Sequence, residues 1–241
     1  MREPGSPLQI AILVPTHEKV DALWAYDLAQ MMAFTTSFMP PDQGHSLGLL
    51  MATNTYIHKS RQELLKRALD DGATHVLWLD SDMRFPQHTL LKLLSNNVPV
   101  CGINYSTRRT PADWVAVKRV PEGDDSTGGE RLATLEESEG LEEVAIIGFG
   151  AVLMEAATLV SLPDPNDIPW FMFGKTEHGA DIGEDAWFCL KMLRDVCNER
   201  IFVDHDLSKE CAHIGQFEYR LHHAEASQDA LAELRDTEQE G

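Results

Sequence analysis

Residues 73–83 read Ala-Thr-His-Val-Leu-Trp-Leu-Asp-Ser-Asp-Met, an apolar run that ends directly in two acidic side chains. A short run that is almost entirely apolar and bounded by polar residues indicates a buried strand. Asp80 and Asp82 then follow the point where this strand would leave its sheet. In parallel α/β sheets ligands bind at the carboxyl ends of the strands, so both carboxylates are expected to face a crevice.

The segments on either side of this stretch alternate between strand and helix patterns. Strands are expected over 10–14, 47–52 and 98–103, and helices over 22–38, 57–72 and 88–94. Alternation of this kind predicts an α/β fold, a single domain with a mostly parallel central sheet flanked by helices.

The second half of the chain is less regular. Strands are expected over 114–120 and over 144–154, the latter interrupted by Gly148-Phe149-Gly150. A helix is expected over 184–197, with Cys189, Leu193 and Val196 on its apolar side. No internal repeat or linker divides the chain into two cores.

The net charge of −19 comes largely from two acidic segments. Residues 121–143 contain nine acids and one arginine, and residues 222–241 contain six acids and one arginine. We therefore predict a flexible N-terminus over 1–8, a domain over 9–221 with an acidic surface excursion at 121–143, and an acidic tail over 222–241. The negative field disfavours non-specific binding to nucleic acid.

No stretch of about 18 apolar residues is present, and the first seven residues lack the apolar segment of a secretory signal. A cytoplasmic protein without a membrane span is expected. The four cysteines form no CxxC pair, which favours buried thiols over a disulfide framework or a zinc site.

Asp80 and Asp82 stand one residue apart at the expected strand end. Their mutual repulsion favours a bound cation, and carboxylate oxygens are ligands that suit Mg²⁺ or Mn²⁺. The alternative is a turn in which Asp80 caps the following helix.

Several short segments, in this order, resemble a GT-A-type glycosyltransferase over nearly the whole chain. They are 12–16 (Ile-Leu-Val-Pro-Thr), Arg61, 73–83, Tyr105 with Arg108, 148–151 (Gly-Phe-Gly-Ala), 169–171 (Pro-Trp-Phe), 183–185 (Gly-Glu-Asp) and 213–215 (His-Ile-Gly). The resemblance is to small stand-alone enzymes of bacteria and bacteriophages that use nucleotide-sugar donors and carry a DxD motif.

This resemblance implies a GT-A fold and a donor, in the first place a UDP-sugar, whose base and ribose lie against Pro15 and Thr16. It assigns Asp82 to a divalent cation, Mn²⁺ or Mg²⁺, and Asp80 to the ribose or the metal shell. It also assigns His213 to the metal site. The cation would neutralise the charge that develops on the departing diphosphate.

Further candidate residues follow from the same resemblance. Arg61 lies on the apolar face of its helix and is expected to point toward the phosphates or Asp80, the alternative being an arginine that reaches solvent. Asp185 or Glu184 is the candidate general base, although acids also suit a helix start. In a retaining enzyme the acid would instead orient the donor or acceptor.

Two glycines are the last candidates. Gly148 and Gly150 would let the backbone approach the donor sugar closely, and a β-bulge explains them as well.

The predicted function is transfer of a sugar from a nucleotide-diphosphate sugar to an acceptor hydroxyl. The acceptor is a carbohydrate or small molecule, with a hydroxymethylated base in phage-type DNA as the other class. One alternative is a non-catalytic sugar-nucleotide-binding protein. A DxD phosphatase is disfavoured, because Arg84 stands where such enzymes carry Thr or Val.

Overall fold

The computed structural model describes residues 6–53, 56–118, 129–175, 179, 181–215 and 218–229. Most of the predicted flexible N-terminus, the first part of the acidic excursion and the end of the predicted tail therefore lie outside the described residues.

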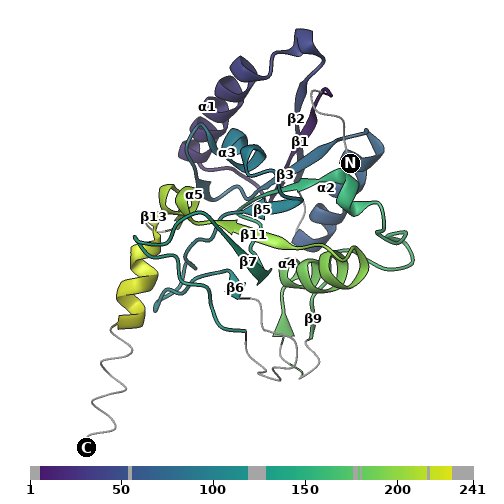
Figure 1. The fold of residues 1–241 in the computed structure, drawn as a ribbon. Helices are drawn as coiled ribbons and strands as arrows, with labels where there is room; N and C mark the ends of the chain where they lie inside the picture. Colours follow the sequence, from purple (N-terminus) through teal and green to yellow (C-terminus); the bar gives the residue numbers. More distant parts are fainter. Residues whose placement is uncertain are drawn as a thin grey trace, which may run out of the picture.

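An eight-stranded sheet forms the centre of the molecule (Figure 1). In spatial order its strands are β2 (Ser46–Thr53), β1 (Gln9–Thr16), β3 (His75–Leu79), β8 (Ala151–Glu155), β5 (Val100–Gly102), β11 (Ile201–Asp204), β7 (Leu141–Ile146) and β6 (Val117–Lys118).

The sheet is mixed. The pairs β1–β2, β1–β3 and β5–β11 are parallel, whereas β3–β8, β5–β8, β7–β11 and β6–β7 are antiparallel. Only β8 and β7 are reversed, so six of the eight strands run in one direction, as the alternating pattern predicts. The strand pairing nevertheless differs from that of a parallel sheet, because β8 lies between β3 and β5 and is antiparallel to both.

Helices cover both faces of this sheet (Figure 1). The core on one face includes side chains of α1 (Ala22–Phe38), α3 (Thr89–Ser95) and α5 (His205–Glu210). The core on the other face includes side chains of α2 (Ile57–Asp70) and of the helix formed by α4 (Glu184–Trp187) and η3 (Phe188–Val196). Strand β1 serves both, since Ile12 packs on the α1 side and Leu13 on the α2 side.

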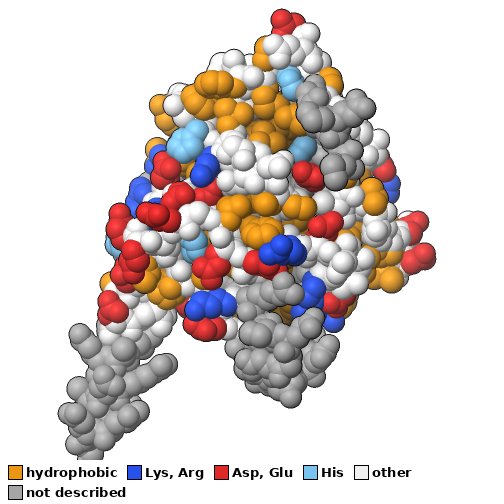
Figure 2. Space-filling model, viewed as in Figure 1, with side chains coloured by type: hydrophobic (Ala, Val, Ile, Leu, Met, Phe, Trp, Pro, Cys, Tyr) orange, Lys and Arg blue, Asp and Glu red, His pale blue; other side chains and the backbone are white. Residues whose placement is uncertain are grey.

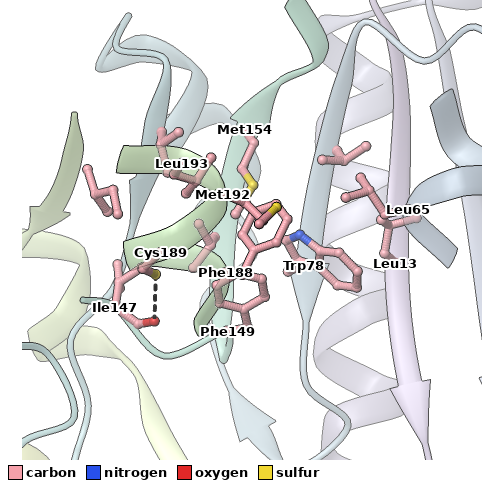
Figure 3. Packing of buried hydrophobic residues seen from close by; sticks show 14 of the residues in the cluster. Leu13, Leu65, Trp78, Ile147, Phe149, Met154, Phe188, Cys189, Met192 and Leu193 are labelled. Carbon is pink, nitrogen blue, oxygen red and sulfur yellow. Dashed lines mark hydrogen bonds between the residues drawn. The ribbon is translucent and has the colours of Figure 1, made fainter. Parts of the chain in front are cut away.

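Aromatic side chains fill the core between α2, the sheet and η3 (Figure 3). Trp78 of β3 lies 5.5 Å from Phe149, and Phe149 lies 5.8 Å from Phe188 of η3 in an edge-on contact, both measured between ring centroids. Rings of this size bury large apolar areas and prefer such tilted geometries. This packing fixes the strand end that carries Asp80.

Smaller elements complete the fold. A three-stranded sheet joins β4 (Met83–Arg84), β12 (Ala212–Ile214) and β13 (Glu218–Tyr219), and β9 (Gly174–Lys175) pairs with β10 (Asp181–Ile182). Two short 3₁₀ turns are η1 (Pro41–Gln43) and η2 (Ala156–Leu159). Because β4 and β12 are antiparallel neighbours, the chain just after Asp82 lies beside His213.

The helix predicted over 184–197 is present, but its geometry differs. After one α-helical turn, residues 188–196 form a π-helix, whose wider turns rotate the buried side. Phe188 and Met192 are buried, whereas Val196, predicted on the apolar side, is 40% exposed. The prediction of Val196 was wrong because it assumed 3.6 residues per turn.

The described parts of the two acidic segments contain regular structure. Residues 141–143, placed in the excursion, belong to β7, which pairs with β11. Residues 221–229, placed mostly in the tail, are helical, and Leu221 and Ala224 pack near Ala112 and Trp114. None of the helices in the described ranges is long and apolar enough to cross a membrane.

Candidate functional site

A cavity of about 320 Å³ opens at the carboxyl ends of β1 and β3. Its lining comes from the end of β1, the first turn of α2, the segment after β3, and two residues from later in the chain: Pro15, Thr16, His17, Ile57, Ser60, Asp80, Ser81, Asp82, Arg108 and His213. The volume falls in the range of small-molecule sites, and the position is where α/β sheets bind ligands. Five predicted site residues therefore meet here: Pro15, Thr16, Asp80, Asp82 and His213.

Asp82 lies between two cationic or cation-binding groups. Arg108 Nη1 is 2.8 Å from Asp82 Oδ2, and His213 Nε2 is 3.5 Å from the same oxygen. Burial alone would raise the pKa of Asp82, but the His213 hydrogen bond and the charges of His213 and Arg108 bring its pKa below the ordinary value. Asp82 is thus held as a carboxylate.

The tautomer of His213 follows from the hydrogen bond of its second ring nitrogen, Nδ1. His213 Nδ1 lies 3.0 Å from the carbonyl oxygen of Ser106, which can only accept, so Nδ1 carries a hydrogen and donates. In the neutral ring Nε2 then carries no hydrogen, and its lone pair faces the Asp82 carboxylate. That contact is favourable only with a proton on Nε2 or a cation between the two groups.

The first acid of the motif, Asp80, has a different environment. Arg61 Nη2 donates to Asp80 Oδ1 at 3.1 Å and to Oδ2 at 3.3 Å. Burial raises the pKa of Asp80 to about 7, and the negative charges of Asp82 and Asp185 add to the shift while Arg61 opposes it. Asp80 is therefore the carboxyl in the site that gains or loses a proton near neutral pH.

Arg61 itself is only 2% exposed. Its guanidinium carbon lies 4.7 Å from the Phe149 ring centroid and 5.8 Å from that of Trp78, and Nε is 3.4 Å from Glu184 Oε1. A buried guanidinium needs anionic partners, and it finds two. Of the two predicted directions for Arg61, phosphates or Asp80, the described contacts give Asp80; the solvent-reaching alternative is wrong.

The two acids at the start of α4 differ from one another. Glu184 is buried, and its carboxylate pairs with Arg61. Asp185 is half-buried and accepts a hydrogen bond from the backbone N–H of Ala186 at 2.7 Å. Neither lines the cavity, although the Asp185 charge contributes to the raised pKa of Asp80. Arg61 thus links the DxD segment to α4.

The predicted donor-binding glycines face a buried tyrosine. A Cβ on Gly148 would lie 2.4 Å from Tyr105 Oη, and one on Gly150 would lie 2.7 Å from a Tyr105 ring carbon. Both glycines are buried and neither lines the cavity. Here they provide room for Tyr105, whose ring in turn contacts His213 edge-on at 5.2 Å between centroids.

Four lining residues were not predicted: His17, Ile57, Ser60 and Ser81. Ser60 is 1% exposed, and its Oγ has no hydrogen-bond partner among the described residues. Its position next to Arg61 on the inner side of α2 was the available signal, but a small polar residue on a helix is too common to single out.

The donor set can be compared with what a divalent cation requires. Within the described ranges, no three His, Cys, Asp or Glu side chains are grouped closely enough to hold a metal ion on their own. Asp82 and the Nε2 lone pair of His213 supply two converging ligands. Mg²⁺ is commonly bound through one or two protein ligands together with substrate phosphates and water, and this donor set fits that arrangement.

Comparison with known proteins supports the fold. No protein-family model matches the sequence, and no curated protein matches it. Among solved structures, the chain is similar to A197 from STIV, with a TM-score of 0.50, 13% identity, and 86% of each chain covered. At this identity the similarity concerns only the fold, a mixed α/β domain with a large central sheet flanked by helices.

Proposed function

We propose that this chain is a GT-A-type, metal-dependent glycosyltransferase that moves a sugar from a nucleotide-diphosphate sugar to an acceptor hydroxyl. The observation that carries the proposal is the convergence of Asp80, Asp82 and His213, from distant parts of the chain, in one cavity at the carboxyl ends of β1 and β3. The fold similarity is compatible with it.

The cavity supplies separate roles for a donor of this class. Pro15 and Thr16 form the wall against which the base and ribose would lie, and the orphan Ser60 hydroxyl is available to a donor hydroxyl. Asp82 and His213 would hold Mn²⁺ or Mg²⁺, which when bound neutralises charge on the leaving diphosphate.

Arg108 is the exposed cation at the rim of the site. It is partly exposed and pairs with Asp82. When a cation occupies Asp82, the guanidinium is free to turn toward a phosphate, which suits its bidentate donors.

Asp185 is the better general-base candidate of the acidic pair. Glu184 is buried and forms an ion pair with Arg61, whereas no ion pair involves Asp185 among the described residues. In an inverting reaction Asp185 would accept the acceptor's proton as the hydroxyl oxygen bonds to the anomeric carbon and the bond to the diphosphate breaks. In a retaining reaction Asp185 would orient the acceptor or the donor, and the departing phosphate would take the proton.

For the acceptor we propose a carbohydrate or small molecule ahead of a modified DNA base. The net charge of −19 would repel a DNA duplex at long range. A UDP-sugar is the first donor to test, and the cytoplasm is the proposed location.

The test is donor hydrolysis and transfer with a panel of UDP-, GDP- and dTDP-sugars, with Mn²⁺ or with chelator, read as nucleoside-diphosphate release. We expect metal-dependent release that Asp82→Asn abolishes while circular dichroism stays unchanged. Asp42→Asn is the control, since Asp42 is exposed in η1 at the opposite end of the sheet.

The outcomes separate the alternatives. Metal-dependent donor binding without turnover, with any acceptor class, would indicate a non-catalytic nucleotide-sugar-binding protein. Equal donor binding with Mn²⁺ and with chelator would exclude the proposed role of Asp82.

A further inference from the structure

Strand β2 forms one edge of the central sheet and carries no charge. Its sequence, Ser-Leu-Gly-Leu-Leu-Met-Ala-Thr over 46–53, contains no charged residue and no proline. It is paired on one side only, with β1, among the described residues. Long, uncharged, apolar edge strands readily pair with another strand, and proteins usually protect them.

The opposite edge of the same sheet is protected. Strand β6 has only two residues and an irregular register, and Val117 forms a bridge with Arg131. Lys118 forms an ion pair with Glu130, which directly precedes Arg131. Short strands, bulges and charged residues are the usual means of blocking edge pairing, so their absence at β2 is specific to that edge.

The backbone groups on the free side of β2 can be assigned. The N–H of Ser46 donates to the carbonyl oxygen of Leu8 at 2.8 Å, so Ser46 faces the β1 side. In a parallel ladder alternate residues bond the same neighbour. Leu47, Leu49 and Met51 therefore present their N–H and C=O groups at the free edge.

The same residues carry exposed apolar side chains. In the β1–β2 register, Leu49 and Met51 stand beside Ile12 and Val14, which pack under α1. Leu49 is 38% exposed and Met51 is 44% exposed, because α1 covers β1 more fully than the edge strand.

Helix α1 extends this apolar surface. Its side chains Tyr26 and Phe38 are largely exposed. Figure 2 shows hydrophobic side chains gathered over the region of α1 and β2, with few charges among them.

We propose that β2 pairs with β2 of a second copy of this chain, forming an antiparallel, two-fold symmetric dimer with one continuous sheet. A strand edge is self-complementary under a two-fold axis, so no other partner is needed to satisfy its backbone groups. A second copy also brings its own Leu49, Met51 and α1 to the apolar strip. Because β2 carries no charged residue, the contact places no like-charged side chains of the two copies opposite one another.

The test is sedimentation equilibrium of the full chain from about 1 to 100 μM. The wild-type protein should approach twice its mass of 27.0 kDa. Leu49→Lys places a positive charge on each copy at the β2–β2 contact, and it should raise the dissociation constant of the dimer at least about ten-fold. Leu49→Pro removes an outward N–H that β1 does not use, and it should have the same effect.

Val196→Lys is the matched control, because Val196 is 40% exposed and lies on η3, which packs beside β7 at the other side of the sheet. It should leave the dimer within about two-fold of wild type. Unchanged circular dichroism and a cooperative thermal transition in both Leu49 variants would show that the fold survives. A wild-type monomer throughout this range, or a dimer that neither Leu49 variant weakens, would overturn the proposal.

Discussion

Replacement of Arg61 by methionine tests whether this residue holds the two halves of the candidate site together. The methionine keeps an apolar stem between Phe149 and Trp78 but removes the guanidinium that pairs with Asp80 and Glu184. Removing one partner of a buried ion pair costs about 3–5 kcal/mol, because the remaining charge is left uncompensated. For a domain of this size that loss corresponds to a decrease in melting temperature of roughly 6–20 °C.

The size of this effect should depend on pH. Without Arg61 the pKa of Asp80, already about 7, moves further up, so Asp80 is neutral in acid and an unpaired buried carboxylate in base. The loss of stability should therefore be smaller at pH 5 than at pH 8.

Urea denaturation followed by circular dichroism at both pH values measures the free energy of unfolding. Arg67→Met is the control on the same helix, since Arg67 is exposed and its ion pair with Asp71 spans 3.7 Å; its effect should stay within about 0.5 kcal/mol. A loss below about 1 kcal/mol for Arg61→Met, the value of a surface pair, would refute the reasoning.

Four further results are expected. Mn²⁺ affinity with donor present, measured by calorimetry, should rise as pH increases through about 7, because ionised Asp80 adds a negative charge beside the proposed ligand Asp82, and Asp80→Asn should reduce that rise. His213→Ala should weaken Mn²⁺ binding in the same assay; unchanged affinity would make His213 a structural residue. Asp185→Asn should lower turnover by roughly 10²- to 10⁴-fold with donor affinity retained, whereas loss of donor affinity instead would favour an orienting role. Gly150→Ala should destabilise the fold by about 1–3 kcal/mol through overpacking against Tyr105, and a neutral effect on urea unfolding would contradict the packing role.

The first half of the fold was predictable because its periodicity is local. The expected strand at 10–14 and helix at 22–38 match β1 and α1. The strand is an uninterrupted apolar run that is buried on both faces, and the buried side chains of the helix recur every three or four residues. The reversed strand β8 was different. Its sequence is as apolar as that of a parallel strand, and its insertion between β3 and β5 depends on pairing across the whole chain.

The candidate site divides in the same way. Asp80 and Asp82 could be predicted because a strand end and two acids coincide in one short segment. Partners from distant segments could not be derived from the local pattern. The ion pair of Arg61 with Glu184, and the packing of Tyr105 against Gly148, depend on tertiary contacts. The π-helix was not predicted either, because no residue type in 188–196 indicates a turn wider than that of an α-helix.

The antiparallel contact between β4 and β12 has a consequence for how the protein matures during synthesis. Asp82 leaves the ribosome early, but His213 belongs to one of the last described strands, and only their pairing brings the imidazole to the carboxylate. The nascent chain can therefore assemble β1, β2 and β3 long before the proposed cation site is complete. Emerging intermediates of this protein would thus be folded around an acidic strand end whose histidine partner has not yet been synthesised.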